Sequence, residues 1–249
     1  IDNHVERREG IIKNFEKYYD RIFNYDFIFE GWSIKKIQKI NCFGDSHISC
    51  FADVKTLAQE NIFHINENFS SKRFGPYLAY SLPHKNNVLE EINAISKDEN
   101  VLICFGEIDC RAQVKRISEE TKKEEKDVIE DIVSNYFSVI DKSNNKNIIL
   151  FSVAPELKEQ PHWYYYKDNP SVFDCPKGTL SERQFYKTYF NSRVKEEAEK
   201  RGYKFISIFD YIAPNGIANE MYYLDDIHLL PKRVFYLIKR EMIKNNLKI

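Results

Sequence analysis

The sequence lacks the patterns that mark several classes of protein. Its five cysteines are odd in number and form no CxxC pair, which argues against a disulfide framework and against a zinc site. No apolar run approaches the roughly 18–20 residues that a helix needs to span a bilayer. The 37 lysines and arginines nearly balance the 38 acidic residues, so no excess charge favours nucleic acid or an anionic membrane. There is no internal repeat and no low-complexity linker.

These absences favour a reducing compartment, and we expect a cytoplasmic location with no metal, no cofactor and no nucleic-acid partner. The 249 residues, 43% of them hydrophobic, are enough for one large α/β domain or two small ones. Cys42 and Cys104 lie in strand-like apolar runs, where a free thiol acts as a small buried hydrophobe. The first residue is Ile and not Met, as expected of an excised domain or a trimmed chain.

Short apolar runs typical of strands alternate with helical patterns along most of the chain. The runs are residues 37–43, 61–65, 101–106, 147–155 and 203–210. Continuous apolar strands between helices indicate a parallel sheet with both faces covered. Residues 1–34 do not fit this alternation. We expect a helical or irregular extension there, followed by one α/β domain over residues 35–249.

Three segments carry helix signals. Within residues 118–140, apolar residues recur at i, i+3, i+4 and i+7 and predict one buried helix face. Ser181 and Gln184 form a capping-box pattern at the start of a helix that stops at Gly202. Residues 231–246 begin with proline, which is favoured at the first position of a helix, and predict a terminal helix.

Polar residues follow several of the predicted strands. In such sheets ligands bind at the carboxyl ends of the strands, where Ser46 and the segment Glu107–Arg111 fall. Gly44 permits a tight exit from the first strand, which leaves Ser46 exposed at the start of a helix. There its backbone N–H can face a developing oxyanion. Gly-Asp-Ser by itself is common turn chemistry, so a catalytic role for this serine depends on a partner elsewhere in the chain.

A nucleophilic serine needs a base, and the base needs an orienting group. Near the end of the chain, Asp225 precedes His228 by three residues in the sequence DDIH. This spacing lets the carboxylate hold Nδ1 of the imidazole while Nε2 points at the serine. Asp226 is the alternative orienting residue, although the i, i+3 spacing favours Asp225.

The sequences FGDSH, which contains Ser46, and DDIH resemble the first and last blocks of the SGNH (GDSL-type) hydrolase superfamily. The resemblance implies a three-layer α/β/α fold with a flavodoxin-like parallel sheet of about five strands. It also implies a catalytic triad, with Ser46 as the nucleophile, His228 as the base and Asp225 as the partner of the base. The superfamily includes esterases, lipases, carbohydrate deacetylases and O-acetyltransferases.

The middle blocks of the superfamily match this sequence less closely. The resemblance assigns Gly75 to the oxyanion-hole glycine of the second block. The third block, GxND, falls on CFGEIDCR, where Gly106 and Asp109 match but Ile108 replaces the asparagine that normally donates to the oxyanion. Either Arg111 substitutes as a donor, or the chemistry is weakened or lost. FGDSH together with FGEIDCR also resembles SGNH-like proteins encoded with glycan-assembly enzymes.

Further residues are candidates for substrate binding. His47 is expected to line the site rather than act as the base, since its direction diverges from that of the serine. Glu107 and Arg111 form either an internal ion pair or a substrate-binding pair. A long connection rich in aromatic residues contains Trp163, and it is either a packed surface excursion or a platform for a sugar.

The sequence predicts a serine-dependent acyl-ester hydrolase or O-acyltransferase, with an acylated carbohydrate or an acyl donor as its partner. A second hypothesis is a non-catalytic SGNH-like module that binds glycan or a partner chain, which the missing asparagine favours. A third is a metallophosphoesterase, because Asp45 and His47 have the spacing of shared metal ligands. The GDxxD and GNH[DE] motifs of that class do not occur in the sequence, so we rank this hypothesis last.

Overall fold

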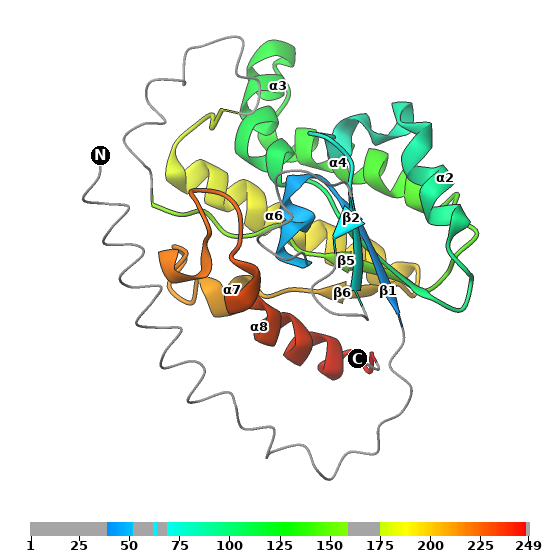
Figure 1. Ribbon diagram of the computed structural model, residues 1–249. Helices are drawn as coiled ribbons and strands as arrows, with labels where there is room; N and C mark the ends of the chain where they lie inside the picture. The colour runs from blue at the N-terminus through cyan, green and yellow to red at the C-terminus, as the bar shows by residue number, and fades with distance from the viewer. Residues whose placement is uncertain (1–38, 52–61, 64–68, 159–174, 248–249) are drawn as a thin grey trace, which may run out of the picture. The chain divides into compact units, whose positions relative to one another are not determined.

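The computed structural model of the chain (Figure 1) describes residues 39–51, 62–63, 69–158 and 175–247. Two of the expectations lie outside these ranges, namely the N-terminal extension over residues 1–34 and the aromatic platform that includes Trp163. Within the described ranges, no helix is both long enough and apolar enough to cross a membrane.

A six-stranded sheet lies at the centre of the described residues, in the order β2-β3-β1-β4-β5-β6. Its strands are β1 (Ile40–Gly44), β2 (Ile62–Phe63), β3 (Phe69–Arg73), β4 (Asn100–Cys104), β5 (Ile148–Phe151) and β6 (Lys204–Ile206). Strand β2 pairs antiparallel with β3 at one edge, and the other five strands are parallel. Numbered in chain order, these five have the flavodoxin-like order 2-1-3-4-5. The predicted fold class is confirmed.

Both faces of the sheet bury apolar side chains, because successive residues of a strand point to opposite faces. In β4, Val101 and Ile103 belong to one hydrophobic cluster, whereas Leu102 and Cys104 belong to the other. All five residues of β4 are buried, as expected of a central parallel strand. Cys42 is buried in β1 in the same way, and all five cysteines are buried and form no disulfide with one another.

Helices cover the two faces in separate groups (Figure 1). The first cluster is completed by α2 (Asn86–Ala94), α4 (Glu125–Ile140) and α6 (Leu180–Lys200). The second is completed by η2 (Ser46–Phe51), α7 (Phe209–Ile212) and α8 (Pro231–Lys244). The remaining elements are η4 (Ala79–His84), η5 (Asp109–Gln113), α3 (Val114–Thr121) and η6 (Glu220–Tyr222). The result is three layers, helices on each side of the sheet.

Strand β3 carries no apolar run and was not predicted. Its sequence is FSSKR, and among its residues only Phe69 and Ser71 are buried. The Ser71 hydroxyl donates to the carbonyl oxygen of Phe51 over 3.2 Å. Pairing with β1, in which Ile40 lies opposite Phe69, gives the segment its extended conformation. The hydrophobic pattern alone does not contain this information.

Helix α6 begins two residues earlier than the capping-box prediction at Ser181. The N-cap is Thr179, whose side chain accepts from the Glu182 N–H over 3.2 Å, while the Glu182 carboxylate accepts from the Thr179 N–H over 2.7 Å. This reciprocal pair is a capping box, and it overlaps the predicted one. Gln184 instead accepts from the backbone N–H of Glu156 over 2.8 Å.

The other helix predictions have mixed outcomes. The segment 118–140 contains two helices, because Lys122 takes a left-handed conformation with φ of 61° and ends α3. No glycine marks this break, and the sequence contains no other signal for it. Gly202 follows α6 with φ of 72°, and α8 starts at Pro231, so both of these terminal signals are confirmed.

Gly106, which follows β4, should not tolerate a side chain. Its φ is 113°, and a Cβ there would lie 2.4 Å from the Phe190 ring of α6. The Gly106→Ala variant combines backbone strain with overpacking, each about 1–3 kcal/mol. We therefore expect the free energy of unfolding, measured by urea denaturation, to fall by about 2–5 kcal/mol.

Gly202→Ala is the matched control, because its φ is also positive but a Cβ there would meet no atom within 4 Å. The free energy of unfolding of this variant should fall only by the strain of a left-handed alanine, about 1–2 kcal/mol. Equal losses in the two variants would contradict the packing role of Gly106.

Candidate active site

The carboxyl ends of β1 and β4 lie side by side where the order of the sheet reverses. The two strands pair in parallel with Gly44 opposite Cys104. A Cβ on Gly44 would lie 2.3 Å from the carbonyl oxygen of Cys104, so this approach requires glycine. Such a switch point is where open α/β sheets bind their ligands.

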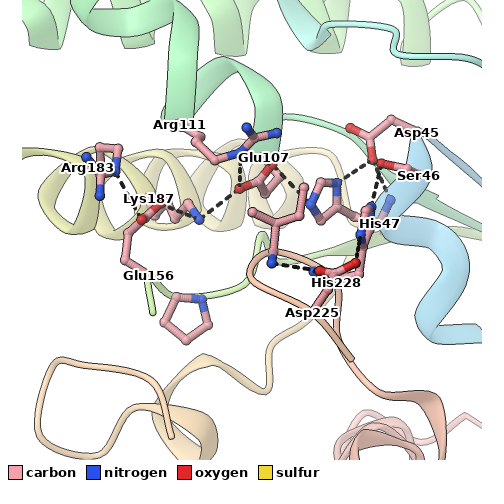
Figure 2. Close-up of polar contacts among 12 residues, drawn as sticks. Asp45, Ser46, His47, Glu107, Arg111, Glu156, Arg183, Lys187, Asp225 and His228 are labelled. Carbon is pink, nitrogen blue, oxygen red and sulfur yellow. Dashed lines mark hydrogen bonds and ion pairs between the residues drawn. The ribbon is translucent and has the colours of Figure 1, made fainter. Parts of the chain in front are cut away.

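Ser46, His228 and Asp225 meet at this point, although they are far apart in the sequence. Ser46 is the first residue of η2 and is separated from β1 by Asp45 alone, while Asp225 and His228 lie between η6 and α8. His228 Nε2 is 2.9 Å from Ser46 Oγ, and His228 Nδ1 is 2.8 Å from Asp225 Oδ2 (Figure 2). The three residues that the sequence singled out form one hydrogen-bonded chain.

The loop that carries Asp225 and His228 holds both side chains in this orientation. An isolated antiparallel bridge between Tyr223 and Leu229 closes its base. Asp225 Oδ1 accepts from the backbone N–H groups of Ile227, over 2.8 Å, and of His228, over 2.7 Å. Its other oxygen, Oδ2, is thereby directed at the imidazole.

The carboxylate that holds His228 is that of Asp225, at the i, i+3 position, and not that of Asp226. Burial raises the pKa of Asp225, but the hydrogen bond and the charge of His228 lower it more, and the pKa falls to about 2. The carboxylate is therefore ionised at neutral pH and can accept a hydrogen bond from Nδ1–H.

His47 lies beside the triad with its ring against that of His228. The two ring centroids are 4.8 Å apart and the planes differ by 29°. His47 Nδ1 is 3.0 Å from Asp45 Oδ1, and Nε2 is 3.1 Å from Glu107 Oε2. Burial lowers the pKa of His47, but the negative charges of Glu107 and Asp45 outweigh burial, and the pKa is raised.

Glu107 belongs to a line of buried charged side chains, which we call the buried charge cluster: Asp45, His47, Glu107, Arg111, Glu156, Arg183 and Lys187 (Figure 2). Arg111 Nε donates to the Glu107 carboxylate over 3.1 Å, and Lys187 Nζ is 3.0 Å from it. Lys187 Nζ is also 2.7 Å from Glu156 Oε1, and Arg183 Nε is 3.0 Å from Glu156 Oε2. Carboxylates and cations therefore alternate along the cluster.

The charges of this cluster keep Glu107 ionised although it is buried. Burial raises the pKa of Glu107, but the charges of Arg111, His47 and Lys187 prevail and hold the pKa well below its usual value. Between the two alternatives for Glu107 and Arg111, the contacts match the internal ion pair.

Glu156, Arg183 and Lys187 were not among the predicted site residues. The sequence contains one signal that could have identified Arg183 and Lys187. They lie four residues apart in α6, on the face that also buries Tyr186 and Phe190. Charged residues in a buried helical stripe require partners of opposite charge.

Several solved structures share this architecture. A mutant of an acetyl-xylooligosaccharide esterase from Geobacillus Stearmophilus is 14% identical, with a TM-score of 0.50, over 86% of this chain and 96% of that chain. A proposed platelet activating factor from Streptococcus pneumonia is 14% identical, with a TM-score of 0.52, over 99% of both chains. A proposed acylhydrolase from Bacteroides fragilis is 16% identical, with a TM-score of 0.50, over 86% of this chain and 92% of that chain. The chain has the fold of the SGNH hydrolases.

Neither a scan against models of protein families nor a search of curated proteins gave a match to this sequence. The likeness to the SGNH hydrolases is therefore one of fold, together with the resemblance of the sequences FGDSH and DDIH to their first and last blocks. In the structure, these two blocks supply the serine and the Asp-His pair of the hydrogen-bonded chain.

Two residues of the third SGNH block have structural contacts. Asp109, which starts the π-helical turn η5, accepts from the backbone N–H of Ala79 over 2.8 Å and from that of Tyr80 over 3.1 Å. It therefore fixes the start of η4. Gly106 allows Phe190 of α6 to pack closely after β4. Neither observation requires a role in substrate binding.

The predicted role of Gly75 and Arg111 as oxyanion donors stays a prediction. Gly75 is exposed in the turn after β3. Ile108, at the position of the SGNH asparagine, is buried but belongs to neither hydrophobic cluster. The Nε of Arg111, its proposed substitute, donates to Glu107.

The metallophosphoesterase hypothesis gains no support from these contacts. Asp45 Oδ1 and His47 Nδ1, its two candidate ligand atoms, are hydrogen-bonded to each other. Among the residues that the structure describes, no group of three His, Cys, Asp or Glu side chains is placed to hold a metal ion.

Asp109 should make the stability of the fold depend on pH. Burial, which outweighs the two N–H donors, raises its pKa to about 7. Because the folded pKa exceeds the unfolded value of about 3.9, this group contributes stability below pH 4 that is lost as the pH rises to about 7. The difference corresponds to at most roughly 4 kcal/mol.

We expect the free energy of unfolding of the wild type, measured in urea at pH 5 and pH 8, to fall more over this interval than that of Asp109→Asn. The variant should be less stable at both pH values, since an amide can accept from only one of the two donors with its oxygen. If the wild type and Asp109→Asn lose the same free energy of unfolding between pH 5 and pH 8, Asp109 does not titrate in this range.

Proposed function

We propose that this protein is a serine-dependent ester hydrolase. The observation that carries the proposal is the hydrogen-bonded chain Ser46–His228–Asp225 at the switch point of the sheet. A serine is a weak nucleophile unless a base accepts its proton, and the base works best when a third group fixes its ring. Both conditions are met by groups within 2.9 Å of each other.

In the proposed reaction, Ser46 Oγ attacks the carbonyl carbon of the ester and passes its proton to His228 Nε2. The ionised Asp225 stabilises the imidazolium that forms, and His228 then gives the proton to the departing alcohol oxygen. An acyl group remains on Ser46. Water attacks this acyl-enzyme while His228 accepts one of its protons, and the serine is released with its proton restored.

The oxyanion that forms in each step needs donors close to Ser46. The backbone N–H of His47 is not one of them, because it donates to Asp45 Oδ1 over 2.8 Å. In the proposal the donors are the backbone N–H groups of Ser46 and Gly75, with no side-chain amide at Ile108. Loss of one such donor typically costs about 10²–10³ in kcat, so we expect a slow hydrolase.

An acetylated carbohydrate is the substrate that we propose. The similar structure from Geobacillus is an acetyl-xylooligosaccharide esterase, which supports this class, as does the resemblance of FGDSH and FGEIDCR to SGNH-like proteins encoded with glycan-assembly enzymes. An O-acyltransferase would share the acyl-enzyme step and differ only in using a sugar hydroxyl in place of water.

A non-catalytic binding module is the alternative, and the buried Ile108 in place of an oxyanion donor is the observation that favours it. The two functions are separated by a fluorophosphonate probe, which reacts only with an activated serine. Labelling of the wild type and not of Ser46→Ala supports the hydrolase. No labelling, together with no release of acetate from aryl acetates or acetylated xylo-oligosaccharides, would support the binding module.

The triad should behave as one unit. We expect Ser46→Ala and His228→Ala each to lower kcat for an aryl acetate by about 10³–10⁶-fold, and the double variant by little more, because each single change already disables the same step. Initial rates of aryl acetate hydrolysis measure this effect. Near-wild-type turnover by Ser46→Ala would remove the serine mechanism.

Substitution of Asp225 should lower kcat far more than substitution of its neighbour Asp226. Asp225→Asn places an amide where an ionised acceptor is needed and should lower kcat by about 10²–10⁴-fold. Asp226→Asn is the matched control and should change kcat less than about threefold, because its carboxylate does not hold the His228 ring. Comparable losses in both variants would contradict the assignment of Asp225.

A further inference from the structure

The ring of His47 has a carboxylate close to each of its nitrogens. Asp45 Oδ1 is hydrogen-bonded to Nδ1 over 3.0 Å, whereas Glu107 Oε2 lies 3.1 Å from Nε2 as an ion-pair contact without hydrogen-bond geometry. Asp45 Oδ1 also accepts from the backbone N–H of His47, which ties the start of the side chain to the same carboxylate. A ring held at opposite edges cannot rotate without breaking one of these contacts.

Glu107 is itself fixed. The Arg111 Nε lies 3.1 Å from each of its oxygens, and Lys187 Nζ is 3.0 Å from one of them. All of these side chains are buried, with exposed fractions of 2% for Glu107 and 4% for each cation. The buried charge cluster therefore holds Glu107 in place, and Glu107 in turn holds His47.

The face of this fixed ring is what His228 contacts. His228 lies on a loop and its side chain is 23% exposed. Its hydrogen bond to Asp225 fixes the position of Nδ1, but rotation of the ring about that bond would still move Nε2 away from the serine. The stacking of the two rings, with centroids 4.8 Å apart, opposes this rotation.

Carboxylate oxygens only accept hydrogen bonds, so two carboxylates favour a proton on each of the nitrogens that face them. A neutral ring would direct the lone pair of one nitrogen at a carboxylate oxygen. The geometry therefore favours His47 as an imidazolium, whose charge Asp45 and Glu107 offset.

We propose that His47 is a positioning residue for His228: Asp45 and Glu107 clamp its ring as an imidazolium, and the clamped ring fixes the plane in which His228 meets Ser46. This inference rests on the proposed function, because the plane of His228 matters for the transfer of the serine proton. A misplacement of about 1 Å in such a geometry can cost about 10²-fold in rate.

Kinetics of three variants test the proposal. His47→Ala removes the ring, His47→Gln keeps a polar side chain without a flat ring, and His47→Phe keeps the flat ring without nitrogens. We expect Ala and Gln to lower kcat for an aryl acetate by about 10–100-fold with KM changed less than threefold, and Phe to recover part of the loss. Fluorophosphonate labelling should slow by a similar factor. His84→Ala, which alters an exposed histidine at the end of η4, should leave both rates unchanged.

An unchanged kcat in His47→Ala and His47→Gln would overturn the proposal. So would losses that match only a decrease in the folded fraction, measured by circular dichroism on the same samples. A wild type that neither turns over acyl esters nor labels would instead refute the proposed function, and it is recognised before any variant is made.

Nitrogen NMR of histidine-labelled protein at pH 7 decides the inference independently of activity and of the folding of the variants. In the wild type we expect both ring nitrogens of His47 to carry protons, and the Nδ1 proton of His228 to give a low-field signal from its bond to Asp225. His47→Ala should weaken that signal, whereas Ser46→Ala should keep it. A neutral His47 ring, or a His228 signal that is indifferent to His47, would overturn the proposal.

Discussion

The parallel pairing of β1 with β4 is the constraint on which the site depends. Gly44 and Cys104 end these strands opposite each other, and the backbones are so close that a Cβ on Gly44 would lie 2.3 Å from the Cys104 carbonyl. This approach brings the start of η2, with Ser46, next to the segment after β4, with Glu107. The loop before α8 then needs to supply only the base and its carboxylate to complete the hydrogen-bonded chain.

The buried charge cluster occupies the same edge of the sheet. Removing one partner from a buried ion pair typically costs about 3–5 kcal/mol, although a pair as a whole adds little stability over apolar residues. The cluster is therefore better understood as a device for orientation than as a source of stability. It connects α6, through Lys187 and Arg183, to the segments that follow β4 and β5, and through His47 it reaches the imidazole of His228.

The proposed site combines the hydrogen-bonded chain of Ser46, His228 and Asp225 with fewer oxyanion donors than the SGNH pattern would supply. The resemblance places Ile108 at the position of the SGNH asparagine, and the nearby Arg111 donates through Nε to Glu107. In the proposed mechanism, such a site forms and hydrolyses an acyl-enzyme with less stabilisation of the tetrahedral intermediate than a full oxyanion hole gives. The clamped His47 is one means by which the geometry of the base is kept despite that loss.

The sequence by itself determined the α/β class with a largely parallel sheet, the apolar strands β1, β4, β5 and β6, and the residues of the Ser-His-Asp chain. Each of these has a local signal: a continuous apolar run, a glycine before a polar turn, or a fixed spacing of Asp225 and His228. Only the tertiary structure decided that FSSKR is strand β3, that the apolar run at 61–65 supplies the antiparallel edge strand β2, and that Asp109 holds η4. It also brought Arg183 and Lys187 to Glu107 and Glu156. These outcomes depend on contacts between residues distant in sequence. The same residue types at other positions of the chain would lie on the surface, in contact with water, so the residue types alone do not predict burial.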